Sequence, residues 1–398
     1  MEASKQRVVF VGGGLANALA AYRLSLARPD LELVVIERDA EMLGEHTWSF
    51  HGGDLLRAGA AGVASSWIAP FVTASWPRYA VRFPGQAREV GLGYHAIRSG
   101  AMVPRFRRLF PGAIMTGTSV TQVEASGVTL ADGTRLAADW VVDGRGAAVD
   151  ATRGVVGYQA FYGRFLKLAR PHGLRGPTLM DATGEQAGGF RFMYVLPFAP
   201  DMVLVEDTLY GREAHIDVDA SGRRIDAYAR QLGLEVCGDD GDERAALPIP
   251  LTGVALTPAP VGVVRSGVAA GLFHAVTGYS VGEAVQFAEA LAAAFTATAS
   301  PSRATLARDL QRRAQGRWRR AALHRRLNNM FFLAAPAEAR YKVLMHFYQL
   351  EDAVIGRFYA GEMSWRDWAR FFSGPPPVAP LRGVRSFLRV PRSAEELL

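Results

Sequence analysis

The N-terminal residues alternate between apolar runs and one glycine-rich turn. Residues 8–11 form a continuous apolar run rich in β-branched side chains, which is typical of a strand buried on both faces. Glycines occupy positions 12–14, and the alanine- and leucine-rich stretch 15–26 predicts a helix. A second apolar run, 33–36, predicts another buried strand. The pattern therefore predicts a βαβ unit in a parallel sheet.

The rest of the chain changes character twice. Short alternating strands are predicted for 127–142, with Asp132-Gly133 as a hairpin turn, and a further strand-to-glycine junction follows at 143–146. Strands dominate 158–208, prolines and glycines mark 252–264 as loop or edge strand, and helices are predicted from 282 onward. The fold class is thus α/β, with a β-rich part and a helical C-terminal region. We find no membrane-spanning segment, since the uncharged stretch 245–264, which no other exceeds in length, is broken by prolines.

Composition narrows the choice of class. A length of 398 residues fits two or three linked domains, and 49% hydrophobic with 21% charged residues is typical of a globular protein. The net charge of +7 favours anionic partners. With Cys237 as the single cysteine no intrachain disulfide can form, which fits a reducing compartment. The histidines are scattered without metal-ligand spacing, so we predict no metal site.

The glycine turn has the spacing of a dinucleotide-binding motif. In GGGLAN, Gly12 permits the tight turn and Gly14 lets the backbone approach a pyrophosphate at the helix N-terminus. Glu37 ends the second strand, where its carboxylate can accept hydrogen bonds from ribose hydroxyls. Asn17 replaces the third glycine and is a tighter fit there. The acid favours an unphosphorylated ribose, and FAD and NAD both stay open at this point.

Blocks over nearly the whole chain resemble the bacterial lycopene β-cyclases, and they follow the family's order. They are GGGLAN (12–17), EHTWSFH (45–51), DGRG (143–146), GYQAF (157–161), MDAT (180–183), FRFMYVLP (190–197), VEDT (205–208), LPI (247–249), AGLFHAVTGYS (270–280) and RFYAG (357–361). HTWSF, the RFMYVLP block with EDT close behind it, and the FHAVTGYS block are the specific ones.

The resemblance implies an FAD-binding Rossmann-like domain joined to a β-rich substrate domain, as in flavin monooxygenases. We expect the FAD-binding domain in 1–65, 106–156 and 260–300, the substrate domain in 66–105 and 157–259, and a basic, membrane-facing helical region in 301–398. The family needs reduced FAD, with NADPH as electron source, although its reaction is an isomerisation that turns each ψ-end of lycopene into a β-ring. The cofactor contacts that we predict are Gly12, Gly14, Leu15, Ala16, Glu37, Arg38, Val120, Asp143, Arg145, Gly271, Thr277, Gly278 and Tyr279.

Such a cyclisation needs a neutral carboxyl group in a dry pocket to protonate an alkene, and aromatic faces to stabilise the cation. The resemblance makes Glu206, paired with Asp207, the leading acid, although a strand end facing solvent is the alternative from sequence alone. His46 and Trp48 are predicted near the flavin and the polyene end, with core packing as the alternative for both. The chain departs from the family at Phe165, where relatives often carry a glutamate. We expect this change to leave Glu206 as the more economical acid and to leave room for altered substrate preference.

Arginines are concentrated between Arg303 and Arg326, and the chain then turns apolar at Met330, Phe331 and Phe332. This order favours an interfacial helix on an anionic membrane over a solvated basic face. Arginines without a recognition motif do not indicate nucleic-acid binding. We expect a cytoplasmic, peripherally membrane-associated enzyme of the isomerase or intramolecular lyase class. Two alternatives stay open: a flavin-dependent monooxygenase or reductase of another isoprenoid lipid, and a carotenoid-binding protein that retains FAD as structure.

Overall fold

The N-terminal elements form a parallel sheet in the computed structural model, which describes residues 5–58, 63, 66–146, 154–256, 258–373 and 378–397. The strands are β1 (Arg7–Val11), β2 (Glu32–Ile36), β8 (Ala113–Met115), β12 (Trp140–Asp143) and β18 (Val264–Arg265), in the order β18-β12-β1-β2-β8. β1 pairs in parallel with β2 and β12, and both of its faces are covered by apolar clusters. A strand covered on both faces has no place for polar side chains, which explains its unbroken apolar run.

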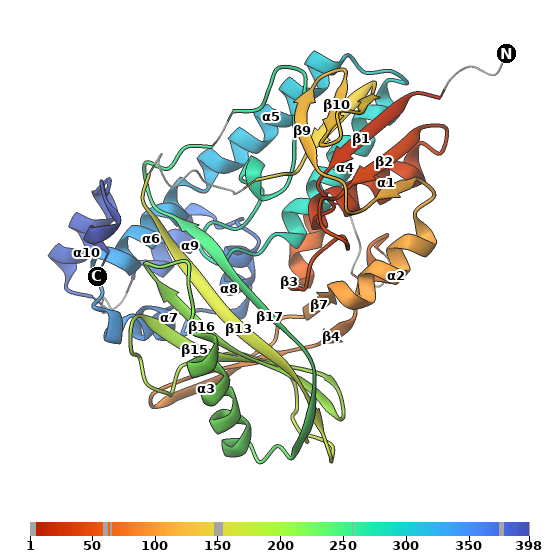
Figure 1. The fold of residues 1–398 in the computed structure, drawn as a ribbon. Helices are drawn as coiled ribbons and strands as arrows, with labels where there is room; N and C mark the ends of the chain where they lie inside the picture. The colour runs from red at the N-terminus through yellow and green to blue at the C-terminus, as the bar shows by residue number, and fades with distance from the viewer. Residues whose placement is uncertain are drawn as a thin grey trace.

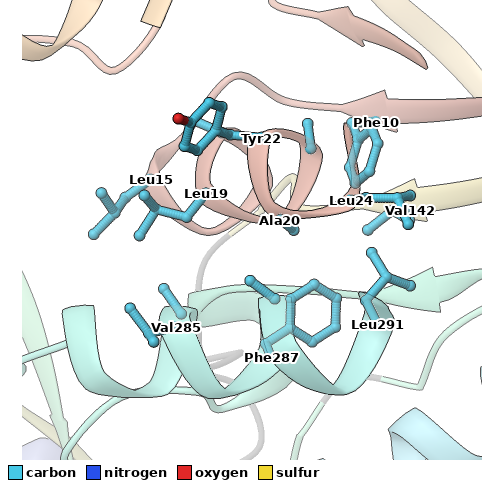
Figure 2. Packing of buried hydrophobic residues seen from close by; sticks show 14 of the residues in the cluster. Phe10, Leu15, Leu19, Ala20, Tyr22, Leu24, Val142, Val285, Phe287 and Leu291 are labelled. Atoms are coloured by element: carbon cyan, nitrogen blue, oxygen red, sulfur yellow. The ribbon is translucent and has the colours of Figure 1, made fainter. Parts of the chain in front are cut away.

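Helices cover one face of this sheet and a β-ribbon covers the other. The helices are α1 (Leu15–Ala27), α2 (Ser99–Leu109) and α4 (Val281–Ala297), and the ribbon is β9 (Val120–Glu124), β10 (Gly127–Leu130) and β11 (Arg135–Ala137). Figure 2 shows Leu19 and Ala20 of α1 facing Val285 and Phe287 of α4 across a closely packed interface. The many alanines of both helices allow this close approach, and so fix the N-terminus of α1 over the sheet.

A large, mainly antiparallel sheet forms the lower half of Figure 1. Its strands, in the order β17-β13-β16-β15-β14-β5-β6, are β5 (Tyr79–Phe83), β6 (Gln86–Val90), β13 (Val156–Leu168), β14 (Thr178–Asp181), β15 (Phe190–Ala199), β16 (Met202–Gly211) and β17 (Val236–Pro250). The outer face packs against α3 (Val218–Gln231), and the inner face packs against the C-terminal helices. Both faces are buried, so residues one apart on a strand lie in different cores.

A small antiparallel sheet of β3 (Thr47–His51), β7 (Tyr94–Arg98) and β4 (Ala74–Trp76) connects the two halves. The hydroxyl of Tyr94 on β7 lies 2.7 Å from the hydroxyls of both Tyr194 on β15 and Tyr279 before α4. The small sheet therefore holds the parallel sheet with its helices and the large antiparallel sheet in one fixed arrangement around the space between them.

Helices make up most of the chain after α4. They are α5 (Arg303–Arg320), α6 (Ala322–Leu333), α7 (Tyr341–Phe347), α8 (Asp352–Tyr359), α9 (Trp365–Phe371) and α10 (Pro380–Leu388). Short 3₁₀ turns lie at Gly52–Ala58, Ala69–Phe71, Val268–Ala270, Ala337–Ala339 and Ala394–Glu396. Within the described ranges no helix has both the length and the apolar character needed to cross a bilayer.

The predicted elements agree well with this fold. The βαβ unit, the Asp132-Gly133 hairpin, the strands between 158 and 208 and the helical C-terminal region are all present. The segment 252–264 contains only the first residue of β18 among its described residues, as its prolines suggested. The domain boundaries drawn from the sequence stay a prediction. Some contacts differ from them, since Ile68, Phe71, Ile97 and Met102 of the predicted substrate segment 66–105 pack in the same core cluster as α1.

Candidate active site

The first cavity lies at the carboxyl ends of β1, β2, β12 and β18 and has a volume of about 330 Å³. Gly12, Gly14, Leu15, Ala16 and Glu37 line it, as predicted from the glycine motif. This is the place where open parallel sheets bind nucleotides, because loops of neighbouring strands diverge there and the helix N-terminus presents free N–H groups.

Glu37 is tied to the glycine loop. Its carboxylate accepts hydrogen bonds from the backbone N–H of Gly13 at 2.6 Å and of Asp39 at 3.0 Å, one to each oxygen. Gly12 has a φ of +93°, which side chains rarely adopt. The turn between β1 and α1 is therefore held in the shape that opens the cavity toward the end of β2.

Asn17 explains how the chain works without the third glycine. Its side-chain amide donates to the carbonyls of Val11 at 3.0 Å and Gly12 at 2.8 Å, and its Oδ1 accepts from the hydroxyl of Ser266 at 2.6 Å. Asn17 is 1% exposed, so these bonds form out of water. A side chain at Gly144 would collide with both Asn17 and Ser266, so the close packing moves to a glycine elsewhere in the loop cluster.

Several predicted cofactor contacts do not line this cavity, and their role stays a prediction. Arg38 extends into solvent beside Asp39. Asp143 is buried, and its carboxylate accepts a hydrogen bond from Arg145. The guanidinium of Arg145 also donates to the carbonyl of Val120, so hydrogen bonds link these three residues behind the cavity wall. The glycines beside them, Gly144 and Gly146, line the cavity instead. Gly271 has a φ of +71° and packs against Leu256 and Trp318, away from the cavity.

The cavity fits a dinucleotide by a geometric test. A Cβ built on Gly14 meets no atom within 4 Å, although the residue is at the helix N-terminus and its backbone is compatible with alanine. We expect Gly14→Ala to fold as stably as the wild type but to bind FAD about tenfold more weakly or worse, because the methyl group occupies pyrophosphate space. Flavin fluorescence titration measures this. The control is Gly53→Ala, an exposed glycine whose Cβ also meets nothing. Unchanged FAD affinity in Gly14→Ala would place the pyrophosphate elsewhere.

A second cavity of about 240 Å³, the reaction cavity, lies between the small sheet, the large sheet and the start of α4. Aromatic side chains from separate elements line it, namely Trp48, Phe161, Phe192, Tyr194, Tyr210, Phe273, Tyr279 and Tyr359. His46, Trp48, Val268 and Ser280 line both this cavity and the nucleotide cavity. The predicted residues Thr277 and Gly278 lie in the reaction cavity rather than in the nucleotide cavity. The two cavities therefore adjoin, and β3 with its HTW sequence forms part of the wall between them.

Glu206 lines the reaction cavity and is 6% exposed. Burial is the main reason that the pKa of its carboxyl is raised to about 8. The neighbouring carboxyl of Glu243 raises this pKa further, and Asp207 adds the smallest contribution. A hydrogen bond from the Thr208 hydroxyl acts in the opposite direction and lowers it. Glu206 lies directly opposite Tyr194 in the β15–β16 pairing. The site thus contains a carboxyl group that stays protonated at neutral pH beside aromatic surfaces.

Glu243 is a buried carboxyl close to Glu206 that sequence reasoning missed. It is 4% exposed on β17, and burial raises the pKa of its carboxyl to about 7, while Thr47 and Arg98 oppose the shift. It flanks Gly163 on β13, which pairs with Glu206 on the other side. Burial is the largest cause of the raised pKa of Glu206, and Glu243 adds more to it than the sequence neighbour Asp207 does.

Asp207 lies on the opposite face of β16, so its predicted place in the site is corrected. Its Oδ2 accepts from Arg191 at 2.6 Å, from the Ser221 hydroxyl at 2.7 Å and from Arg224 at 3.3 Å, under helix α3. Alternate residues of a strand point to opposite faces, and here both faces are buried. Glu206 and Asp207 are consequently separated by the sheet, and Asp207 fastens α3 to it.

Hydrogen-bonded tyrosines form one wall of the reaction cavity. Tyr194 donates to the Ser49 hydroxyl at 2.7 Å, and Tyr94 joins Tyr194 to Tyr279. Burial raises the pKa of Tyr194 and of Tyr279 well above the usual range, so both stay neutral phenols. His51 is buried against Tyr359, with ring centroids 4.3 Å apart, and burial lowers its pKa to about 3. Ser49 and His51 come from the EHTWSFH block, Tyr194 from FRFMYVLP, Tyr279 from TGYS and Tyr359 from RFYAG, which was the available sequence signal, whereas Tyr94 lies in none of the blocks.

The remaining singled-out residues have structural surroundings. His274 is buried, with Nδ1 2.9 Å from the Thr277 hydroxyl and Nε2 3.0 Å from the carbonyl of Phe358, and it lines neither of these two cavities. Phe165 lies outside the reaction cavity with its ring 3.7 Å from the guanidinium of Arg98. Phe165 pairs with Leu204 on β16, whereas Gly163 pairs with Glu206, so the departure lies two residues along β13 from the partner of the acid. Among the described residues no group of three or more His, Cys, Asp or Glu is placed to hold a metal ion.

The basic stretch forms α5 and α6, but its apolar continuation is core. Phe332 is 0% exposed and packs against Gly157 of β13, and Phe331 is buried beside Phe190 and Tyr210. The expectation of a bilayer-facing surface is therefore wrong for Phe331 and Phe332, whereas Met330 is half-buried. Some of the arginines are also engaged, since Arg303 donates to backbone carbonyls of Ala138 and Asp139 and Arg317 pairs with Glu283.

Solved structures with the same architecture define the class of protein. The chain matches a geranylgeranyl bacteriochlorophyll reductase-like protein from Thermoplasma acidophilum with a TM-score of 0.59 and 14% identity, covering 92% of this chain and 96% of that one. It matches the flavin-dependent brominase Bmp2 with a TM-score of 0.61 and 14% identity, covering 92% and 97%. The fold is that of flavin-dependent monooxygenases and reductases, as predicted.

Sequence comparison then gives the family. A family model described as lycopene cyclase protein matches residues 7–385. The chain is 39% identical over 388 residues to the lycopene beta-cyclase of Pantoea ananas, covering 97% of this chain and 98% of the relative. It is 40% identical over 373 residues to that of Pseudescherichia vulneris, covering 93% and 94%. The chain belongs to the lycopene cyclase family, which confirms the resemblance found in the motifs.

Proposed function

We propose that this protein is a lycopene β-cyclase that converts the ψ-ends of lycopene to β-rings through γ-carotene to β-carotene. The observation that carries the proposal is the buried Glu206 carboxyl with a pKa of about 8 in an aromatic cavity that adjoins a nucleotide cavity. A neutral acid without nearby water is what protonation of an isolated alkene requires, and family membership supplies the substrate class.

Glu206 donates its proton to the terminal double bond and leaves a tertiary carbocation. The next double bond attacks that carbon and closes the ring, and the ring cation then loses a proton to form the ring alkene. The product has the same atoms as the substrate, so the reaction is an isomerisation with no net oxidation. The Glu206 carboxylate left by the first step is poorly solvated and lies near Glu243, so it takes up the released proton and regenerates the acid.

The aromatic lining stabilises the cation while it exists. Trp48, Phe192 and Tyr279 present ring faces or edges to the cavity, and a desolvated cation–π contact contributes about 2 kcal/mol. Neutral phenols add no competing nucleophilic charge. The largely apolar lining and the bound hydrocarbon also exclude water from the cavity. Capture of the cation by water would give a hydroxylated product. His46, whose pKa burial lowers, stays neutral at the boundary between the cavities.

FAD is the cofactor that the nucleotide cavity fits. Gly12, Gly14, Leu15 and Ala16 would hold its pyrophosphate, and Glu37 its ribose. In reduced form, with NADPH as the electron source, FAD supplies negative charge that stabilises a cation without being consumed. We further propose that the enzyme is cytoplasmic and binds the membrane surface peripherally, because its substrate dissolves in lipid and not in water.

Anaerobic incubation of the purified protein with FAD, NADPH and lycopene in liposomes tests the function. We expect γ-carotene and β-carotene to form with no matching oxidation of NADPH beyond that in a control without lycopene. Pigments are separated chromatographically. Unchanged lycopene with flavin bound and reduced would overturn the proposal. Oxygen or NADPH consumed in proportion to product would instead indicate a monooxygenase or reductase of an isoprenoid lipid.

A further inference from the structure

A narrow apolar cavity continues from the reaction cavity toward the C-terminal helices. Its volume is about 60 Å³, and it shares Met180, Tyr210, Thr277 and Tyr359 with the reaction cavity. The other lining residues are almost all apolar, namely Phe190, Ile249, Val276, Leu327, Met330, Phe331, Phe332, Val343, Leu344, Phe347, Phe358 and Phe371, together with Asn328. The shared residues show that the two cavities adjoin, and the lining of the second is mainly apolar.

The polar group of this passage is already satisfied. The amide of Asn328 donates to the carbonyls of Pro250 at 2.9 Å and Ala275 at 2.8 Å. A passage whose amide is internally bonded offers water little and favours apolar contents. A polyene needs such a space, because the reaction cavity accommodates an end group but the conjugated chain must lie elsewhere.

Half-buried residues of α6 and α7 mark the outer end of the passage. Met330, Val343 and Leu344 line it and are partly exposed, in contrast to Phe332 and Phe347 farther in. Helix α10 lies beside this mouth, since a Cβ on Gly383 would be 3.8 Å from the sulfur of Met330. Figure 1 shows α10 beside α6 at the edge of the molecule, where it is accessible. The passage therefore opens next to α10.

The outer face of α10 is apolar and flanked by cations. Leu381, Val384 and Leu388 are 88%, 61% and 64% exposed and lie at helical spacing on one side. Arg382 and Arg385 are exposed between them. The inner face is anchored, because Asn329 of α6 donates to the carbonyl of Ser386 at 3.3 Å. Phe372, 51% exposed at the end of α9, packs edge-on against Phe387 of α10 and extends the apolar surface.

We propose that α10 and Phe372 dock on an anionic lipid bilayer, and that the passage beneath α6 and α7 conducts the polyene from this surface to Glu206. Exposed leucines and valine with interspersed arginines on one amphipathic helix match the apolar and anionic layers of a bilayer surface. The substrate role rests on the proposed function, whereas the docking surface does not. The surface consists of α10 and Phe372, which lie C-terminal to the basic stretch identified from the sequence.

The docking arm compares two triple variants of the full-length protein. In L381S/V384S/L388S we expect sedimentation with phosphatidylglycerol-containing vesicles to fall about tenfold or more, because three apolar contacts with the bilayer are lost. The control, L26S/V236S/V261S, changes exposed apolar residues elsewhere and keeps vesicle binding. Turnover of lycopene in vesicles falls in parallel, while turnover in detergent micelles stays within about twofold. Equal binding of both variants, or a wild type that does not bind vesicles, would overturn the docking surface.

The passage arm uses the rim residue Val343. Val343→Trp fills the mouth, so turnover falls about tenfold or more in vesicles and in micelles, with vesicle binding and FAD content unchanged. The control Lys342→Trp, at an exposed position of the same helix outside the passage, keeps wild-type turnover, and Leu344→Trp repeats the test if the first variant does not fold. Wild-type turnover in a folded tryptophan variant would overturn the passage. If the wild type cyclises no lycopene, the proposed function fails, and lycopene co-eluting with the wild type but not with the tryptophan variant still supports the passage, while equal co-elution overturns it.

Discussion

Replacing Glu206 by glutamine is expected to lower the rate of cyclisation by about 10²–10⁴-fold, the contribution typical of a positioned general acid. Glutamine keeps the shape of the side chain and can still accept from the Thr208 hydroxyl, but it cannot deliver a proton to an alkene. FAD binding should be unchanged, since Glu206 does not line the nucleotide cavity. The measurement is β-carotene formed per flavin-loaded molecule. Wild-type turnover in this variant would remove Glu206 from the mechanism.

The pH dependence supplies a second readout for the same residue. Glu206 has a pKa of about 8 in the folded protein against an ordinary value of 4.5, so wild-type turnover should fall as the pH rises through about 8. The same shift makes the folded state lose stability between these two values, because the unfolded chain releases this proton first. Glutamine does not titrate, so the free energy of unfolding of the variant should rise relative to wild type between pH 5 and pH 8. Urea denaturation measures both free energies of unfolding. The same difference between variant and wild type at pH 5 and at pH 8 would contradict the assigned pKa.

Replacing Asp207 by alanine should have the opposite pattern, with a loss of about 3–5 kcal/mol in the free energy of unfolding and near-normal turnover per folded molecule. Asp207 is 0% exposed, and its removal leaves Arg191, whose side chain is 12% exposed, and Ser221 without their acceptor. Urea denaturation measures the loss. Asp226→Ala is the control, since Asp226 is 47% exposed and its pair with Arg164 should contribute less than about 1 kcal/mol.

A stable but inactive Asp207→Ala would contradict this placement and restore the carboxylate pair predicted from the sequence. The expected result is instead that two adjacent residues have different roles, with Glu206 needed for the reaction and Asp207 for stability. This contrast follows from a strand with two buried faces, where a step of one residue moves a side chain from one core to another.

The sequence was sufficient where local pattern and local structure coincide. The apolar runs, the glycine turn and Glu37 specify the nucleotide half, because each of these residues acts within its own βαβ unit. It was insufficient for Glu243, which lies in the charged stretch GDDGDER and would be read as solvated. Only pairing of β17 with β13 and the approach of Thr47 bury that carboxyl.

The expectation for Phe331 and Phe332 was wrong for a related reason. Apolar residues beside arginines suit a bilayer and a protein core equally, and hydrophobicity alone does not distinguish them. Phe332 is covered by β13, whereas Leu381 and Val384 remain uncovered at the surface. The difference depends on which elements pack together, and that is a property of the whole fold.

The position of Glu206 relative to the apolar passage has a kinetic consequence. The acid lies in the reaction cavity, and the passage leads from there to a mouth beside α10. A linear substrate with two identical ends presents only one of them to the acid at a time. On the proposed route, it must withdraw, turn round in the lipid and return with the other end before the second ring can close. The enzyme would then act distributively, with the one-ring pigment released into the membrane between the two turnovers.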